Sequence, residues 1–261
     1  MEFGMPTLVE CRDLEECCAL GRELGLQFVE FNMSFPQYQL ERLSADSLRR
    51  LTREYGLYFT VHMDESMNPF DFNRRIAEAY TREMLDVIAL AREAGVPRLN
   101  LHLMRGVYVT LPGRRIFLYD VYREEYLKQV RAFAETCERA LAGSDTLICM
   151  ENVDEGLEGF HRAAADCLLE QPHFALTLDV GHACMTGDKD IPFYDAHESR
   201  LRHMHLHNAT TGPHMPLDEG RIDIEACLRR AERTGSTVVV EVKTIEGLRR
   251  SAEWLHARGR L

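Results

Sequence analysis

Residues 74–103 read RRIAEAYTREMLDVIALAREAGVPRLNLHL, and this stretch contains the unit from which most of the chain is built. A helical pattern, Arg74–Ala94, stops at Gly95, and Pro97 and a short apolar run, Arg98–Leu103, come next. A glycine just beyond a helix is the usual left-handed C-cap, and a short apolar run bounded by such signals is typical of a buried strand. The stretch therefore predicts a helix followed by a strand of a parallel sheet.

The same unit recurs along the chain. Three further helical patterns, each followed by a glycine, are Asp13–Leu24, Asp46–Tyr55 and Ile224–Thr234. The eight predicted strands are Thr7–Glu10, Gln27–Phe31, Tyr58–His62, Arg98–Leu103, Leu147–Asn152, Ala175–Asp179, Leu201–His207 and Val238–Lys243. Eight such units favour an α/β fold closed into a single (β/α)₈ TIM barrel over residues 1–261, with an open doubly wound sheet as the alternative. No GxGxxG motif follows a predicted strand, which argues against a dinucleotide site.

Length and composition fit this fold. The chain has 261 residues, of which 45% are hydrophobic, and a barrel of this type has roughly 250 residues, although length alone also allows two domains. The formal net charge of −11 argues against a nucleic-acid partner, because duplex binding relies on clustered Lys and Arg. No apolar run approaches the roughly 18 residues of a membrane span, and the N-terminus lacks the pattern of a signal peptide. Eight scattered cysteines without a CxxC pair favour reduced thiols and a cytoplasmic protein. The oligomeric state stays open, a homo-oligomer included.

Titratable side chains lie at the ends of most predicted strands. They are His62, His102, Glu151, Asp179 with His182, His205 with His207, and Glu241 with Lys243, while Glu30 lies within the second strand. Each of them alone has an ordinary explanation, such as a hydrogen-bonded structural histidine or an edge-strand charge. In a barrel, however, all strand ends meet at one rim, so these side chains are expected to share a small volume.

This joint pattern predicts a metal site. Several carboxylates would be buried together, and Lys243 is the one basic residue other than His at these strand ends. A divalent ion supplies the missing positive charge, and His with carboxylate suits Zn²⁺ or Mn²⁺. A hydrogen-bonded His–carboxylate network without metal is the alternative. His205 and His207 are two residues apart and so share one strand face, which lets one bind metal while the other faces substrate. His214 lies in the loop that follows.

Two predicted loops are long, Met63–Asn73 and Met104–Tyr122. The second carries Arg105, Arg114 and Arg115, which are candidates to bind a phosphate or carboxylate of a substrate. A solvated surface loop is the alternative for these arginines.

The motifs ENV (151–153), LDVGHA (178–183), MHLHN (204–208) with PHMPLDEGRID (213–223), and VVVEVK (238–243) resemble those of the xylose-isomerase-like TIM-barrel superfamily. That group contains sugar isomerases and epimerases and also the zinc-dependent apurinic endonucleases, and the resemblance runs from the second strand to Trp254. In the isomerase branch, the resemblance implies one metal ion held by Glu151, Asp179, His205 and Glu241. It also implies that Glu151 and Glu241 act as acid and base, and that His182 contacts substrate.

The endonuclease branch uses the same four ligands and adds others. His62, His102, His182 and His214 match further zinc ligands of that branch, but the Asp that it places two residues before the last of these is Gly212 here. Residues 208–213 also lack the Arg that the known ketohexose epimerases place after the strand-seven histidines. The resemblance thus leaves the branch open.

The leading hypothesis is a metal-dependent isomerase or epimerase of a small sugar or sugar-phosphate-like carbonyl compound. Glu151, Glu241 and His182 are its expected catalytic residues, and His62, His207, Arg105 and Lys243 its expected substrate-binding residues. A zinc-dependent phosphoesterase related to the apurinic endonucleases is the rival, and a barrel that keeps the site for binding alone is a third class.

Overall fold

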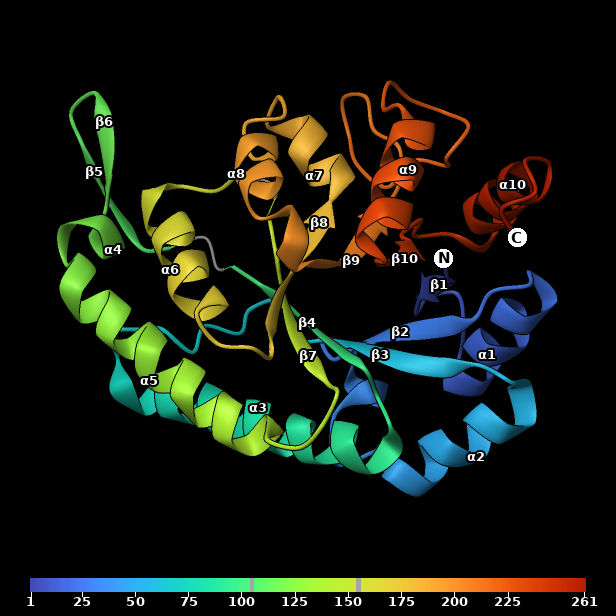
Figure 1. Ribbon diagram of the computed structural model, residues 1–261, viewed down its shortest axis with the longest axis horizontal. Helices are drawn as coiled ribbons and strands as arrows, with labels where there is room; N and C mark the ends of the chain where they lie inside the picture. The colour runs from blue at the N-terminus through green and yellow to red at the C-terminus, as the bar shows by residue number, and fades with distance from the viewer. Residues whose placement is uncertain (104–105, 154–155) are drawn as a thin grey trace.

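The computed structural model describes residues 1–103, 106–153 and 156–261, and these residues form a closed barrel of eight parallel strands surrounded by helices (Figure 1). The order around the barrel is β1-β10-β9-β8-β7-β4-β3-β2, which is chain order apart from one inserted hairpin. β1 pairs with both β2 and β10, so the sheet has no edge. The predicted TIM barrel is confirmed, and the alternative of an open sheet is wrong.

The barrel strands are β1 (Phe3–Pro6), β2 (Phe28–Asn32), β3 (Tyr58–His62), β4 (Arg98–His102), β7 (Leu147–Glu151), β8 (Phe174–Asp179), β9 (Leu201–Leu206) and β10 (Thr237–Val240). Six of the eight lie where the sequence predicts them, to within one residue at either end. Every residue of β2 and β8 is buried, because helices cover the outside of the barrel and side chains fill its interior.

The first strand was predicted wrongly, four residues too late. The predicted strand Thr7–Glu10 is a loop, and β1 contains Gly4 and Pro6, which are poor strand formers. Packing explains the exception, because a Cβ built on Gly4 would lie 2.3 Å from the ring of buried Phe28 on the neighbouring strand. Only glycine lets β1 approach β2 so closely.

Gly4→Ala is therefore expected to lower the free energy of unfolding by about 1 to 3 kcal/mol, the usual cost of overpacking. Gly212→Ala is the matched control, because nothing lies within 4 Å of the added Cβ there. Urea denaturation of both variants measures the difference. A Gly4→Ala protein as stable as the Gly212→Ala protein would contradict this account of β1.

The eighth strand ends earlier than predicted. β10 stops at Val240, so Glu241 and Lys243 begin the loop that follows it. The backbone stays in line with β9 for one residue more, because the Glu241 amide donates to the Leu206 carbonyl at 2.9 Å. Glu241 is thereby fixed at the carboxyl end of the barrel.

The α-helices are α1 (Leu14–Glu23), α2 (Ala45–Tyr55), α3 (Arg74–Ala94), α4 (Leu118–Val121), α5 (Arg123–Leu141), α6 (Gly159–Leu169), α7 (Val180–Met185), α8 (Ile191–Ala196), α9 (Ile224–Thr234) and α10 (Ile245–His256), with 3₁₀ turns at Pro36–Tyr38 and Glu198–Arg200. Gly95 closes α3 in the left-handed conformation, with φ 75°, as the sequence predicts. None of the described helices combines the length and the apolar character that a membrane crossing needs.

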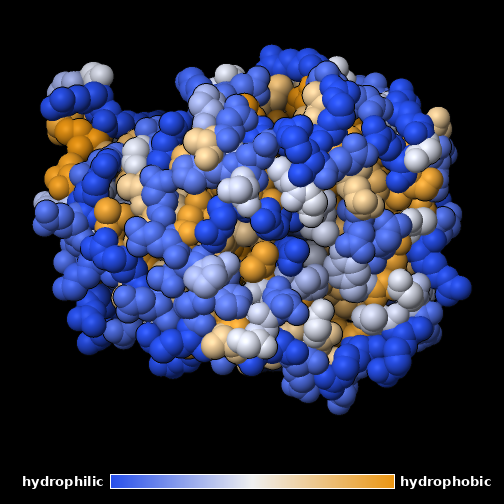
Figure 2. All heavy atoms as spheres, in the orientation of Figure 1, coloured by the Kyte–Doolittle hydropathy of each residue, from blue (hydrophilic) through white to orange (hydrophobic). Residues whose placement is uncertain are grey.

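The hairpin of β5 (Tyr108–Leu111) and β6 (Arg114–Phe117) interrupts the barrel order after β4. The sequence predicts only a loop there, so this element was missed. The hairpin stands out from one end of the molecule (Figure 1), and the space-filling view shows apolar side chains grouped there (Figure 2). Tyr108, Val109 and Leu111 are each at least 40% exposed. The other long loop, Met63–Asn73, contains turns and bends alone.

Candidate metal centre

Four titratable side chains from four neighbouring strands meet at the carboxyl end of the barrel. Glu151 ends β7, Asp179 ends β8, His205 lies in β9 and Glu241 follows β10. One ligand atom of each lies within 4.8 Å of the others. His205 Nδ1 is 3.1 Å from Glu151 Oε1 and 3.4 Å from Glu241 Oε2. The structure thus brings together the four residues that the sequence places at one rim.

The chemistry of this cluster fits a divalent cation. All four residues are at most 5% exposed, and three carboxylates surround a single imidazole. Several polar atoms of the described residues are buried without a hydrogen-bond partner, and four of them belong to this cluster: Glu151 Oε1, His205 Nδ1, His205 Nε2 and Glu241 Oε2. Buried polar atoms without partners are costly, and His with carboxylate is a suitable donor set for Zn²⁺ or Mn²⁺.

The electrostatics of the cluster point the same way. Burial alone would raise the pKa of Glu151, but His205 and His102 hold it well below its usual value. Burial would likewise raise the pKa of Glu241, which Lys243 and His205 hold well below its usual value. Burial would lower the pKa of His205, yet Glu151 and Glu241 raise it well above its usual value. In the metal-free protein, a proton on His205 therefore supplies the positive charge, and a bound metal has to displace it.

His62 and His102 lie on the same rim, beside Glu151. Their Nε2 atoms are 3.6 Å and 3.1 Å from Glu151 Oε2, and their ring centroids are 4.7 Å apart. Asn100, at the centre of β4, donates an amide hydrogen to the same carboxylate oxygen. His62, Glu151 and His205 form a second group whose ligand atoms are close enough for one ion.

His182 and His214 approach the cluster from the other side. His182 Nδ1 is 3.4 Å from Asp179 Oδ2, and His214 Nδ1 is 3.6 Å from Glu241 Oε2. His214 has a φ of 60°, which is uncommon for a residue with a side chain and is a local strain of the kind found at functional sites. Burial lowers the pKa of His214 to about 4, so its imidazole is neutral near pH 7 and has a lone pair to donate.

His207 is buried beside Asp179 and is not among the residues that line the cavity described below. It is fully buried, its Nε2 is 3.1 Å from Asp179 Oδ1, and its Nδ1 accepts the His214 amide at 2.7 Å. The Nε2 proton therefore points at Asp179. The turn from β8 to α7 makes room for the ring, because a Cβ on Gly181 would lie 1.8 Å from it. These contacts support a role in orienting Asp179, in place of the substrate contact expected from the sequence.

Asp179 is held by its backbone as well as by its side chain. Its Oδ1 accepts the His182 amide at 2.6 Å and so caps α7. Asn152 donates to the Asp179 carbonyl at 3.0 Å and accepts from the Asp179 amide at 2.9 Å. The Tyr194 hydroxyl donates to Asn152 Oδ1 at 3.0 Å. The position of this carboxylate is therefore fixed before any ligand arrives.

A cavity of about 170 Å³ opens beside the cluster. It is lined by Pro6, Thr7, Leu8, Val9, Glu30, Asn32, Phe35, His62, Glu65, Glu241 and Lys243. Lys243 donates to Glu241 Oε1 at 2.7 Å, and Asn32 donates to Glu65 Oε1 at 2.9 Å. His62, Glu241 and Lys243, which the sequence predicts as site residues, thus face a space with the size and polar lining for a small polar molecule.

The arginines of the second long loop do not join this cavity where they are described. Arg114 and Arg115 are exposed on β6, and the Arg115 guanidinium lies 4.6 Å from the centre of the Tyr108 ring. Neither residue lines the cavity. Arg114 and Arg115 therefore fit the alternative of a solvated surface loop. Arg105 lies outside the described residues.

Sequence reasoning missed several polar residues of the site. Asn32, Glu65, Asn100 and Asn152 were not selected, although each contacts the cavity or a residue of the cluster. Asn32, Asn100 and Asn152 all lie within or directly after apolar strands, at most two residues from Glu30, His102 and Glu151. A buried amide in such a place is the signal that could have found them. Glu65 lies in an irregular loop and gave no signal.

Lys243→Met should leave metal binding unchanged, because a protonated amine has no lone pair to donate. Glu241 loses a charged hydrogen bond, so kcat/KM should fall by about ten- to a hundredfold. Elemental analysis and kinetics check the two statements, and Arg114→Met is the control for removing an exposed cation. Loss of the metal from Lys243→Met would contradict the assignment.

Known proteins share the barrel. A D-tagatose 3-epimerase-like protein matches with a TM-score of 0.78 and 20% identity, over 98% of this chain and 96% of that chain. A 3-keto-D-glucoside 4-epimerase from E. coli matches with a TM-score of 0.76 and 15% identity, over 98% of this chain and 99% of that chain. D-psicose 3-epimerase from Clostridium cellulolyticum matches with a TM-score of 0.73 and 16% identity, over 100% of this chain and 98% of that chain. A search of the curated proteins found no matching relative. A family model described as xylose isomerase-like TIM barrel matches residues 18–258, and the chain belongs to that family.

Proposed function

We propose that this chain is an enzyme, a metal-dependent isomerase or epimerase that moves a proton beside the carbonyl of a small sugar or sugar-phosphate-like compound. The observation that carries the proposal is the meeting of Glu151 and Glu241 around His205, next to a small polar cavity. Family membership supports it, and so does the likeness in fold to sugar epimerases.

The proposed metal is Zn²⁺ or Mn²⁺, held by Glu151, Asp179, His205 and Glu241. His62, His102, His182 and His214 surround this set and are the candidates for further ligands. When bound, the ion would polarise the carbonyl and hydroxyl oxygens of the substrate and acidify the adjacent C–H.

The proton transfers fall to the two glutamates. Glu151 ends β7 and Glu241 directly follows β10, with β8 and β9 between these strands, so the two carboxylates would reach a substrate from two directions. Both carboxyl groups have pKa values well below the usual range and are ionised at neutral pH. One glutamate would accept the proton and the other would return it. The low pKa values make them weak bases, so the acidified C–H is a requirement of the mechanism.

The remaining residues bind and orient the substrate. His182 Nδ1 lies 3.8 Å from Glu151 Oε1, within reach of a substrate oxygen beside that carboxylate. His62 and Lys243 line the cavity.

All eight cysteines are free, which suits a reducing compartment such as the cytoplasm.

The experiment is proton exchange in D₂O with D-tagatose and D-psicose as probes. Protein loaded with zinc or manganese is expected to introduce one deuterium next to the carbonyl of a ketose that it converts. A chelator should stop the exchange and added metal should restore it. Exchange that persists at full rate in chelated, metal-free protein would contradict the proposal.

The rival phosphoesterase draws its support from His62 and His102 beside Glu151, which suggest a second ion. Gly212, in the place of a further ligand, and the net charge of −11 weigh against it. We expect the zinc-loaded protein to leave an abasic DNA duplex uncut, because the acidic chain repels phosphates. A gel assay measures nicking against a chelated control. Metal-dependent nicking well above that control would replace the isomerase proposal with the rival.

A further inference from the structure

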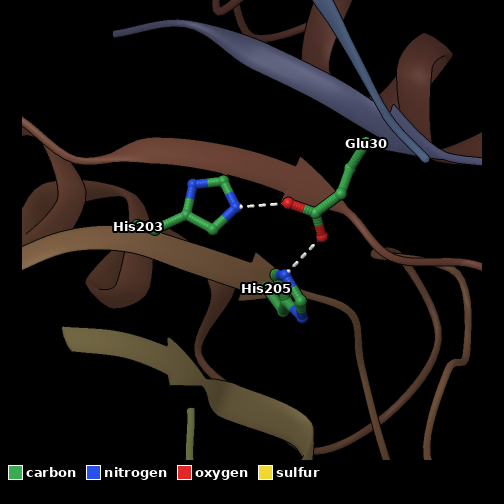
Figure 3. A group of neighbouring side chains, drawn as sticks. All are labelled: Glu30, His203 and His205. Atoms are coloured by element: carbon green, nitrogen blue, oxygen red, sulfur yellow. Dashed lines mark hydrogen bonds and ion pairs between the residues drawn. The ribbon is translucent and has the colours of Figure 1, made fainter. Parts of the chain in front are cut away.

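Glu30 is a buried carboxylate that the proposed reaction does not use. It lies at the centre of β2, is 2% exposed and sits between the imidazoles of His203 and His205 (Figure 3). Its Oε1 is 2.8 Å from His205 Nε2, and its Oε2 is 2.9 Å from His203 Nε2. The Thr60 hydroxyl donates to Oε2 at 2.8 Å. Three donor groups therefore converge on this one side chain.

Glu30 itself indicates where the imidazole protons lie. An ionised carboxylate can only accept, so the His203 proton belongs on Nε2, which is 2.9 Å from Glu30 Oε2, while the far nitrogen, Nδ1, is 2.6 Å from the Thr237 hydroxyl. His205 Nδ1 faces Glu151 Oε1 at 3.1 Å and Glu241 Oε2 at 3.4 Å. Glu30 also favours a proton on Nε2 of His205, because its carboxylate can only accept. In the metal-free protein, Glu151 and Glu241 favour a second proton on Nδ1, and a bound ion would take the place of that proton.

The ligand atoms of these three side chains lie close enough together for an ion, but the contacts of Glu30 account for them as donors around one acceptor. The 2.9 Å contact of His203 Nε2 with Glu30 Oε2 is a hydrogen bond, and the 2.8 Å contact of His205 Nε2 with Glu30 Oε1 is a close ion pair without hydrogen-bond geometry. Glu30 Oε2 already takes both His203 and Thr60. An ion between these atoms would have to displace the donors that stabilise the buried charge of Glu30.

We propose that Glu30 is a positioning residue of the metal centre, which fixes His205 in the tautomer and ring orientation that present Nδ1 to the ion. His203 and Thr60 hold Glu30 in turn. A carboxylate behind a ligating imidazole also makes it a stronger donor, and loss of such a partner typically costs 10- to 100-fold in metal affinity. The inference rests on the proposed metal site.

The first measurement uses the wild-type protein. In ¹⁵N-histidine-labelled, zinc-loaded protein, long-range ¹H–¹⁵N spectra should show His205 with a proton on Nε2 and zinc on Nδ1. The His205 signals are assigned by their loss in His205→Gln. Ligation through Nε2, or an Nε2 without a proton, would overturn the inference without any Glu30 variant. A wild-type protein that binds no zinc would instead overturn the proposed metal site.

The second measurement compares zinc affinities by competition with a chromophoric chelator. Glu30→Gln keeps the size of the side chain but removes its charge. The carbonyl oxygen of the amide can accept from one histidine, but its NH₂ group must then face the N–H of the other. We expect its zinc affinity to fall about 10- to 100-fold. Thr60→Val removes one donor to Glu30 and keeps the carboxylate, so its affinity should stay within about threefold of wild type. Glu30→Asp restores the charge and should recover part of the loss. Equal affinity of Glu30→Gln and wild type would overturn the inference.

Discussion

Glu241→Gln is expected to reduce turnover by about 10²- to 10⁴-fold and to weaken metal binding at the same time. The carboxylate is expected to be both a metal ligand and one of the two proton carriers, and an amide is a poorer ligand that cannot accept the proton. The two losses separate on titration with metal. A high metal concentration should restore occupancy but not turnover.

Glu219→Gln is the matched control for this substitution, because Glu219 is an exposed loop residue that pairs with Arg250 at 3.2 Å. Its turnover and metal content should equal those of the wild type. If Glu241→Gln with metal bound kept near-normal turnover, Glu241 would serve binding alone, and the proposed acid–base pair would be wrong.

Asp179→Asn should have the second large effect, a fall in metal affinity of about 10²- to 10⁴-fold. Removing one charge from a buried, paired set typically costs about 3 to 5 kcal/mol. The fold should survive, because asparagine caps a helix as well as aspartate does and still accepts from His207 Nε2. Competition with a chelator measures the affinity, and circular dichroism checks the fold.

Asp223→Asn is the control, because Asp223 also caps a helix, α9, by accepting the Ala226 amide, but lies outside the cluster. Its metal affinity should not change. An Asp179→Asn protein that binds metal as tightly as Asp223→Asn would exclude Asp179 from the ligand set.

The sequence predicted the barrel because one unit repeats along it. In this unit a helix ends at a glycine, and a short apolar strand follows. It failed at β1, where close packing of Gly4 against Phe28 overrides strand propensity. It also failed at the β5–β6 hairpin, whose side chains are largely exposed and so lack the hydrophobic pattern of a buried strand. Both failures arise where tertiary contacts or exposure, and not local pattern, decide the structure.

A shared rim was predictable because the strand ends of a barrel meet there, and the family resemblance singled out Glu151, Asp179, His205 and Glu241 among the side chains expected at it. Side-chain direction was not predictable. His207 shares a strand face with His205, yet it turns to Asp179 into space that Gly181 leaves.

The network behind the cluster was equally hidden from the sequence. The contact of His205 with Glu30 joins residues far apart in the chain, on β9 and β2, which no local pattern relates. Such contacts emerge only once the strands have closed into a barrel.

The most direct test of the account is anomalous diffraction from crystals grown with zinc or with manganese. The account predicts an ion contacted by Glu151, Asp179, Glu241 and Nδ1 of His205. Data at each metal's absorption edge identify the element and its position. An ion bound elsewhere, with these four side chains still paired only with one another at saturating metal, would contradict it.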